Sequence, residues 1–304
     1  MLNVQAIEYK SPEFTLDIVV TGVGVDIRLN DISVDFDTDG GHSTMTYDVN
    51  QMVIAGVNEI KVITFPFFEN TPPYHQTKNY HSEAEVIVSL YVNEKSNSDA
   101  KEILSQIHLK PQTPSDKVVN LSMKIKELAD IELDNTHQSL LYPDFPISQQ
   151  MTVTRKSLSV QNNYPRWAWQ DGQIIKSNQK NYDSLLAAYR EIYEAYRSKN
   201  RNKLFQLQNE AAEEFALAYA LTGGIAEGHA FIETAEMLDN PDAELYEFFT
   251  DGLNLEVFAD GKMARIVDIA NYHPVLFTHK TLDIIYTLKF SFYKNKQDEW
   301  VMIR

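Results

Sequence analysis

The chain has no cysteine among its 304 residues, which excludes disulfides, thiol catalysis and thiolate metal sites. No apolar run approaches the roughly 18 residues that a membrane-spanning helix needs, and the most apolar stretches, such as 62–68, have the length of strands. Basic residues are few, since 27 Lys and Arg against 43 Asp and Glu give a net charge of −16. Because phosphates would meet like charge, we expect no nucleic-acid partner, and we expect no membrane partner.

The first residues also lack the basic segment and the apolar segment of a secretory signal. Together with the absence of cysteine, this favours a cytoplasmic protein. The chain contains no GxSxG, HExxH, P-loop or GxGxxG sequence, which leaves no motif for a serine nucleophile, a zinc ion or a nucleotide. We therefore expect no catalytic residue, no metal and no cofactor.

Residues 1–160 have the pattern of a β domain. Branched or alternating stretches predict strands over 14–21, 23–29, 59–65, 84–92, 118–125 and 151–160. Segment 96–108 predicts one short helix, with Ile103, Leu104 and Ile107 as its apolar stripe, and 130–150 predicts a long loop. Several short strands separated by Gly, Asp and Pro turns indicate an antiparallel β-sandwich.

The pattern of apolar residues changes after residue 160, and residues 161–304 predict an α+β domain. Apolar residues at helical spacing indicate helices over 181–197, 201–221 and 229–238, with a further turn or two over 243–249. Strands are then expected over 253–258 and 263–269, on either side of an Asp260-Gly261 turn, and over 282–293 and 300–303. The fold class is therefore α+β, a sandwich followed by helices packed on an antiparallel sheet.

The N-terminal part carries a resemblance over segments 25–34, 47–50 and 55–62. Asn30 and the run Gly56 to Asn58 lie where turns need residues that tolerate left-handed backbone. This order of strand, turn, strand and Gly-x-Asn resembles galactose-binding-like jelly-roll modules, and it departs from them at Asp31, where they usually carry Gly. The resemblance implies a sandwich and carries no sugar-binding residue across.

The C-terminal part carries a second resemblance, from Tyr182 onward. Long helices, a short helix and then hairpins that end in 289–293 and 299–303 resemble the cone fold of the nuclear-transport-factor-2-like family. In that family a bent sheet wraps a long helix and the last strand often carries a Trp, here Trp300. The family includes enzymes, scaffolds and ligand binders, so the resemblance leaves the function open.

The most specific signal is a charge pattern. No Lys or Arg occurs between Lys203 and Lys262, and this window holds thirteen acids. The candidate partner-binding residues are Glu210, Glu213, Glu214, Glu227, Glu233, Glu236, Asp239, Asp242, Glu244 and Glu247. Helical spacing puts Glu210, Glu213 and Glu214 on one face, where like charges repel. Such a face either aids solubility or docks a basic partner.

A calcium site and a histidine dyad are also considered. Asp35, Asp37 and Asp39 match the first half of an EF-hand loop, but its twelfth position is Thr46 instead of Glu. We interpret this segment as an acidic hairpin turn and leave calcium binding open. A dyad of His273 or His279 with Asp268 or Asp283 is also left open.

The leading hypothesis is a non-enzymatic binding protein that engages a basic protein partner, in its concrete form an immunity-type inhibitor that neutralises a toxin. One alternative is a small-molecule binder or enzyme whose cone holds Tyr189, Tyr193, His229, Trp300 and Asp283. A second alternative is a carbohydrate-binding module, which a flat row of exposed aromatic residues including Trp167 and Trp169 would indicate.

Overall fold

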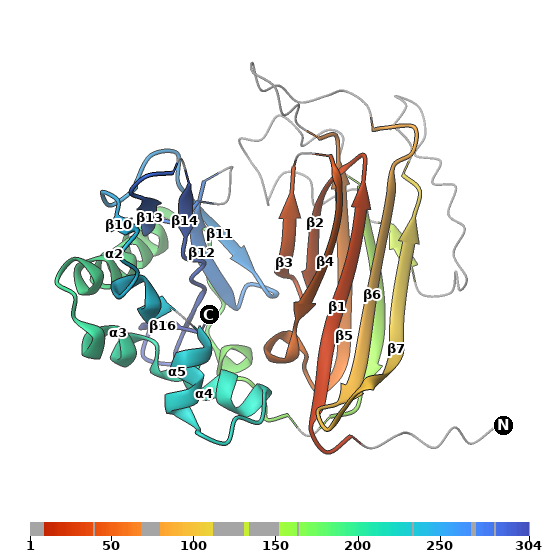
Figure 1. The fold of residues 1–304 in the computed structure, drawn as a ribbon, viewed down its shortest axis with the longest axis horizontal. Helices are drawn as coiled ribbons and strands as arrows, with labels where there is room; N and C mark the ends of the chain where they lie inside the picture. The colour runs from red at the N-terminus through yellow and green to blue at the C-terminus, as the bar shows by residue number, and fades with distance from the viewer. Residues whose placement is uncertain are drawn as a thin grey trace. The chain divides into compact units, whose positions relative to one another are not determined.

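The computed structural model describes residues 9–38, 40–67, 80–111, 131–133, 152–162, 164–232, 234–268, 272–282 and 284–303. They form an α+β fold with antiparallel sheets, divided into two compact units, Met1–Pro165 and Arg166–Arg304 (Figure 1). That 1–160 and 161–304 are independent domains stays a prediction. Among the described helices, none is long and apolar enough to cross a membrane.

The N-terminal unit contains two antiparallel sheets. One has the order β4-β1-β6-β7 and consists of β1 (Pro12–Thr21), β4 (His42–Asp48), β6 (Glu85–Glu94) and β7 (Asn97–Leu109). The other has the order β3-β2-β5-β9-β8 and consists of β2 (Gly24–Leu29), β3 (Ile32–Asp37), β5 (Gly56–Phe65), β8 (Ile131–Leu133) and β9 (Thr152–Val160). The expected strands over 14–21, 23–29, 59–65, 84–92 and 151–160 are thus confirmed.

The two sheets share one hydrophobic core. Leu16 and Ile18 of β1 are fully buried, as are Ile27 and Leu29 of β2, and all four belong to the same cluster. Each such side chain contributes about 1.5–3 kcal/mol when it leaves water. The alternation along these strands therefore defines which face of each sheet points inward.

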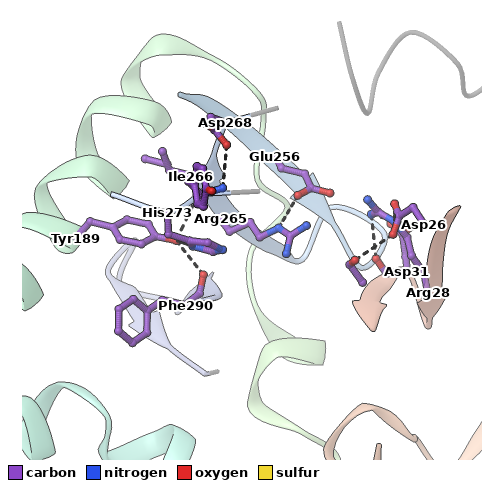
Figure 2. A network of polar contacts seen from close by, with 12 residues as sticks. Asp26, Arg28, Asp31, Tyr189, Glu256, Arg265, Ile266, Asp268, His273 and Phe290 are labelled. Atoms are coloured by element: carbon purple, nitrogen blue, oxygen red, sulfur yellow. Dashed lines mark hydrogen bonds and ion pairs between the residues drawn. The ribbon is translucent and has the colours of Figure 1, made fainter. Parts of the chain in front are cut away.

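A charged cluster occupies the opposite face of β2. Asp26 and Arg28 alternate with the core residues and are fully buried, and the Arg28 Nε lies 2.7 Å from the Asp26 Oδ2 (Figure 2). Asp31 lies in the β2–β3 turn at φ 64° and forms ion pairs with Arg28, at 3.7 Å, and with Lys61 of β5. The acids and bases of this hairpin and its neighbouring strand compensate one another.

The helix expected over 96–108 is wrong, because this segment forms β7. Ser105, Ile107 and Leu109 are buried in alternation, and Ile107 pairs with Val88 of β6. Ile103 is 54% exposed, so no helical stripe is buried here. The strand expected over 118–125 lies outside the described residues, and within the expected loop over 130–150 the described part is β8.

The expected hairpin turn over 35–40 is also wrong. β3 pairs with β2 and β4 pairs with β1, so the chain crosses here from one sheet to the other. Gly40 has φ 65°, and a Cβ at this position would lie 2.2 Å from the ring of Phe67. The crossing therefore needs glycine at this point. Asp39 lies outside the described residues, and within them no group of three or more His, Asp or Glu could hold a metal ion.

The C-terminal unit begins with helices and ends with strands. The helices are η2 (Ala168–Asp171), α2 (Gln179–Arg197), α3 (Arg201–Leu207), α4 (Asn209–Ala218), α5 (Ile225–Ile232) and η3 (Thr234–Leu238). One sheet has the order β10-β13-β14, with β10 (Ala243–Leu245), β13 (Leu276–His279) and β14 (Ile285–Thr287). The other has the order β11-β12-β15-β16, with β11 (Asn254–Phe258), β12 (Met263–Val267), β15 (Phe292–Lys294) and β16 (Trp300–Met302).

Helix α2 organises the core of this unit. The Asn178 side chain accepts a hydrogen bond from the Asn181 backbone N–H and caps the first turn. Leu185, Tyr189 and Ile192 are buried in one cluster with residues of both sheets. The expected helix over 181–197 is confirmed, and so are the strands on either side of Asp260-Gly261.

Four other expectations for this unit need correction. The single helix over 201–221 is two helices, α3 and α4, because Gln208 leaves helical geometry at ψ 3°. The helix over 229–238 begins earlier, at Ile225, and its second half is η3. Segment 243–249 adds no helix, since 243–245 pairs with β13 as β10. The strand over 282–293 is two short strands, β14 and β15.

Candidate functional site

An open groove of about 890 Å³ lies in the C-terminal unit. One wall consists of four consecutive residues, Ile285 to Leu288, and the other of Ile232, Glu236, Met237, Asp239, Asn240 and Pro241. Side chains of a strand alternate between its two faces, so a hollow over one face would touch only every second residue. Contact with four consecutive residues therefore places the groove along the edge of β14.

β14 is an edge strand of its sheet, and part of its backbone points away from β13. The His279 backbone N–H donates to the Ile284 carbonyl at 3.0 Å, which makes these two residues a hydrogen-bonded pair. In an antiparallel ladder such pairs alternate with pairs whose backbone groups face outward. The N–H and C=O groups of Ile285 and Thr287 therefore point out of the sheet, and no described residue pairs with them.

Two carboxylates lie on the wall opposite β14. Glu236 is exposed, and its carboxylate has no ion pair or hydrogen bond with any described residue. Asp239 is 72% exposed and pairs with Arg201, with 2.5 Å between Nη2 and Oδ2. The groove therefore presents negative charge that Arg201 neutralises only in part.

Apolar side chains lie exposed at the β14 end of the groove. Leu282, Ile284 and Ile285 are 55%, 43% and 45% exposed. Single exposed apolar residues are common, whereas these three follow one another closely in the sequence and Ile285 lines the groove. The site thus combines charge, free backbone groups and apolar surface.

A buried polar network in the C-terminal unit centres on Tyr189 and His273 (Figure 2). The Tyr189 hydroxyl donates to the Phe290 carbonyl at 2.8 Å and accepts from the Ile266 backbone N–H at 3.3 Å. His273 Nδ1 lies 3.0 Å from the same hydroxyl, whose only hydrogen is already used, so Nδ1 donates. The backbone N–H of His273 in turn donates to the Thr287 Oγ1 at 3.2 Å, which connects the network to β14.

Both side chains of this network stay neutral. Burial lowers the pKa of His273 well below its ordinary value, and the charges of Arg265 and Lys289 lower it further. Burial also raises the pKa of Tyr189 above its ordinary range. The network therefore supports β14 and is closed to substrate. The His273 imidazole makes no hydrogen bond to a carboxylate among the described residues.

The residues expected to line an enzyme pocket have separate neighbours. Tyr193 packs on Phe248 with 5.3 Å between ring centroids, and His229 stacks on Phe205 at 4.5 Å. The Trp300 Nε1 donates to the Ser184 Oγ at 2.9 Å. The structure therefore does not gather these side chains around one cavity, and Asp283 lies outside the described residues.

Trp167 and Trp169 do not form the exposed row that would indicate a carbohydrate-binding module. Trp167 and Trp169 are 1% and 5% exposed. Trp167 caps η2 and Trp169 lies within it, so neither belongs to a strand. These two rings therefore pack in the interior and offer no flat surface for a sugar.

The face expected from Glu210, Glu213 and Glu214 also needs correction. Glu214 is 6% exposed, and its Oε1 accepts from the Ala168 backbone N–H at 3.0 Å. Glu210 accepts from the Tyr293 hydroxyl at 2.5 Å, and burial together with this bond raises the pKa of Tyr293. The Glu214 carboxylate therefore stabilises the fold, and the Glu210 carboxylate already accepts a hydrogen bond within the unit.

The other candidate acids have different surroundings. Glu213 accepts from the Asn209 side chain at 2.9 Å, and Glu227 accepts from the Gly223 backbone N–H at 2.7 Å. Asp242, Glu244 and Glu247 are also exposed and lie outside the groove, and Glu233 lies outside the described residues. Only Glu236 and Asp239 of the predicted set line the groove. The apolar edge of β14 was missed, because a run of Leu and Ile indicates a buried strand.

Comparison with protein-family models, with curated proteins and with solved structures finds no match to this chain. Its function is therefore inferred from the chemistry of the site. The groove offers carboxylates to a cation, backbone groups to a peptide and apolar surface to an aliphatic side chain.

Proposed function

We propose that this chain is a non-enzymatic binding protein that engages a basic protein partner through the groove beside β14. The observation that carries the proposal is the Glu236 carboxylate, which has no partner among the described residues and lies on the wall of an open groove whose other wall is an exposed apolar strand edge. The net charge of −16 adds long-range attraction, which speeds the encounter with a basic protein.

The most specific form of this proposal is an immunity-type inhibitor that neutralises a toxin in the cytoplasm. A basic active-site cleft, of the kind that binds nucleic acid, is complementary to an acidic surface. The absence of Lys and Arg between Lys203 and Lys262 supports this form. Asp242, Glu244 and Glu247 then extend the negative surface outside the groove.

A second candidate function is small-molecule binding in a nuclear-transport-factor-2-like cone. The packing of α2 against Ala264 and Phe292 of one sheet and Phe277 of the other supports such an arrangement. The interior is filled by Tyr189, whose ring lies 5.0 Å from that of Phe292, so a ligand would bind in the groove outside it. The groove volume of about 890 Å³ lies in the range of ligand sites.

Peptide binding tests the main proposal. The probe is a labelled seven-residue peptide that alternates lysine and valine, and its counterpart carries glutamate for lysine. We expect the lysine peptide to bind, with fluorescence anisotropy as the measurement, and to weaken between about 0.05 and 0.5 M salt as screening shortens. Glu236→Gln should weaken binding about twofold to fivefold, the range for one exposed ion pair.

The matched control is Glu247→Gln, which removes an exposed acid of the same unit that does not line the groove. It should leave the affinity unchanged. Equal weakening by both substitutions would mean that the peptide responds to overall charge alone and would contradict the groove as the site. Equal binding of the glutamate peptide would contradict the proposal altogether.

A further inference from the structure

The free edge of β14 suggests how a basic partner would be held. We infer that an extended segment of the partner, with basic and apolar residues in alternation, adds to β14 as a fourth antiparallel strand of the β10-β13-β14 sheet. This inference rests on the proposed function and adds the mode of recognition to it.

The backbone of β14 has the spacing that strand addition requires. Ile285 and Thr287 are two residues apart, so their outward N–H and C=O groups repeat every 7 Å or so, the repeat of an antiparallel partner. The groove follows this edge over four consecutive residues. An added segment of about four or five residues would cover it, since each residue of a strand rises about 3.4 Å.

The walls of the groove define the chemistry of the segment. Glu236 and Asp239 would face basic side chains, whereas Ile232 and Met237 offer apolar contact. Ile285 continues the apolar surface along the strand itself. A segment that alternates basic and apolar residues offers both kinds of contact, with its basic side chains on one face of the added strand and its apolar side chains on the other.

The two edge strands of the β10-β13-β14 sheet differ in how they are protected against pairing with another strand. Proteins protect exposed edges with charged residues, proline or bulges. The opposite edge strand β10 carries Glu244 at its centre, whereas the segment from Ile284 to Leu288 contains no charged residue and no proline. The pairing of β13 with β14 is regular, so no bulge turns this edge away. The unprotected edge is the one that borders the groove.

The experiment uses the lysine–valine peptide with two substitutions at one position of the full chain. Ile285→Pro removes an outward N–H without touching the bonds to β13, and edge strands tolerate proline. Ile285→Ala shortens the side chain and keeps that N–H. We expect Ile285→Pro to weaken binding about fivefold to tenfold, the loss of one or two hydrogen bonds, and Ile285→Ala to have a smaller effect.

Amide exchange supplies a measurement on the unaltered protein. On peptide binding, exchange at Ile285 and Thr287 should slow, whereas Tyr286, whose N–H faces β13, should change little. A peptide with every backbone amide N-methylated keeps its charges and should lose binding. These two results hold even if the proline variant fails to fold, which circular dichroism would reveal.

The outcomes separate the inference from the proposed function. Equal affinity of the two Ile285 variants, with unchanged exchange at Ile285 and Thr287 and a continued effect of Glu236→Gln, would overturn strand addition and leave the acidic groove as the binding site. Failure of the lysine peptide to bind at any salt concentration would overturn both.

Discussion

In the N-terminal unit, the strands β1, β5 and β6 have ten residues each and run through the interior of their sheets, whereas in the C-terminal unit β10, β14, β15 and β16 have three residues each. The backbone groups of a long interior strand form hydrogen bonds with the neighbouring strands on both sides. Residues of the short strands pack in one cluster with α2, and β14 lies at a sheet edge beside the groove. The N-terminal unit is thus built on long interior strands, whereas the candidate binding site lies beside a short edge strand.

The comparison can be tested separately for each unit. The three tryptophans, Trp167, Trp169 and Trp300, all belong to the C-terminal unit. Tryptophan fluorescence therefore reports unfolding of that unit, while far-ultraviolet circular dichroism reports both. The following predictions use this difference and run from the largest expected effect to the smallest.

Ile18→Ala should have the largest effect. Ile18 is fully buried in the core of the N-terminal unit, and removal of its outer carbons should cost about 2–5 kcal/mol of unfolding free energy. In urea, the circular dichroism transition should move to lower concentration, and the fluorescence transition should stay in place. If both transitions move together, the two units unfold as one and the comparison fails.

Tyr189→Phe should destabilise the C-terminal unit by about 1–3 kcal/mol, because it leaves buried polar partners unsatisfied. The hydroxyl bonds to the Phe290 carbonyl, the Ile266 N–H and His273. The fluorescence transition should therefore move. Tyr193→Phe is the matched control, since its hydroxyl on the same helix has no hydrogen bond with a described residue, and it should have little effect.

The stability of the C-terminal unit should fall as the pH drops below about 6.5, the ordinary pKa of histidine. The depressed pKa of His273 keeps it neutral when folded, so the unfolded chain binds one more proton in this range. The slope reaches at most about 1.4 kcal/mol per pH unit. Arg265 and Lys289 strengthen the effect and Glu256 opposes it.

Urea titrations between pH 5 and 7, followed by tryptophan fluorescence, would measure this slope. His273→Phe should flatten it, although the burial of His229 also lowers its pKa and leaves a smaller slope of the same sign. A slope that survives the loss of His273 would show that another group binds the proton.

Asn178→Ala should have the smallest effect, a loss of about 1 kcal/mol from the C-terminal unit. The Asn178 side chain accepts from the Asn181 backbone N–H at 2.9 Å at the start of α2. Lys180→Ala, in the same turn and 81% exposed, should change stability very little. A comparable loss in both variants would contradict the cap as the source of the effect.

Much of the fold could be predicted wherever one face of an element is buried. Period-two alternation identified β1, β2 and β6, and the 3.6-residue stripe identified α2. β7 was mistaken for a helix because Ile103, Leu104 and Ile107 also fit helical spacing. Its ladder with β6 shifts register near Leu90, which interrupts the alternation that would have revealed a strand.

The site could be predicted only in part. The acidic window contained Glu236 and Asp239, but it also contained Glu214, whose carboxylate is used inside the unit. Sequence spacing places acids on a helix face without showing what packs against that face. The exposure of Ile284 and Ile285 depends on the end of the sheet at β14, a tertiary property that no local pattern carries.

The charged cluster of the N-terminal unit has an evolutionary consequence. Asp26, Arg28, Asp31 and Lys61 balance one another across a turn and two strands, and Arg28 and Asp26 are fully buried. Loss of one member leaves a buried charge without its counterpart, which selection removes more strongly than a change of the whole set. Among natural variants, these four residues should therefore change together, and we expect paired substitutions at positions 26 and 28.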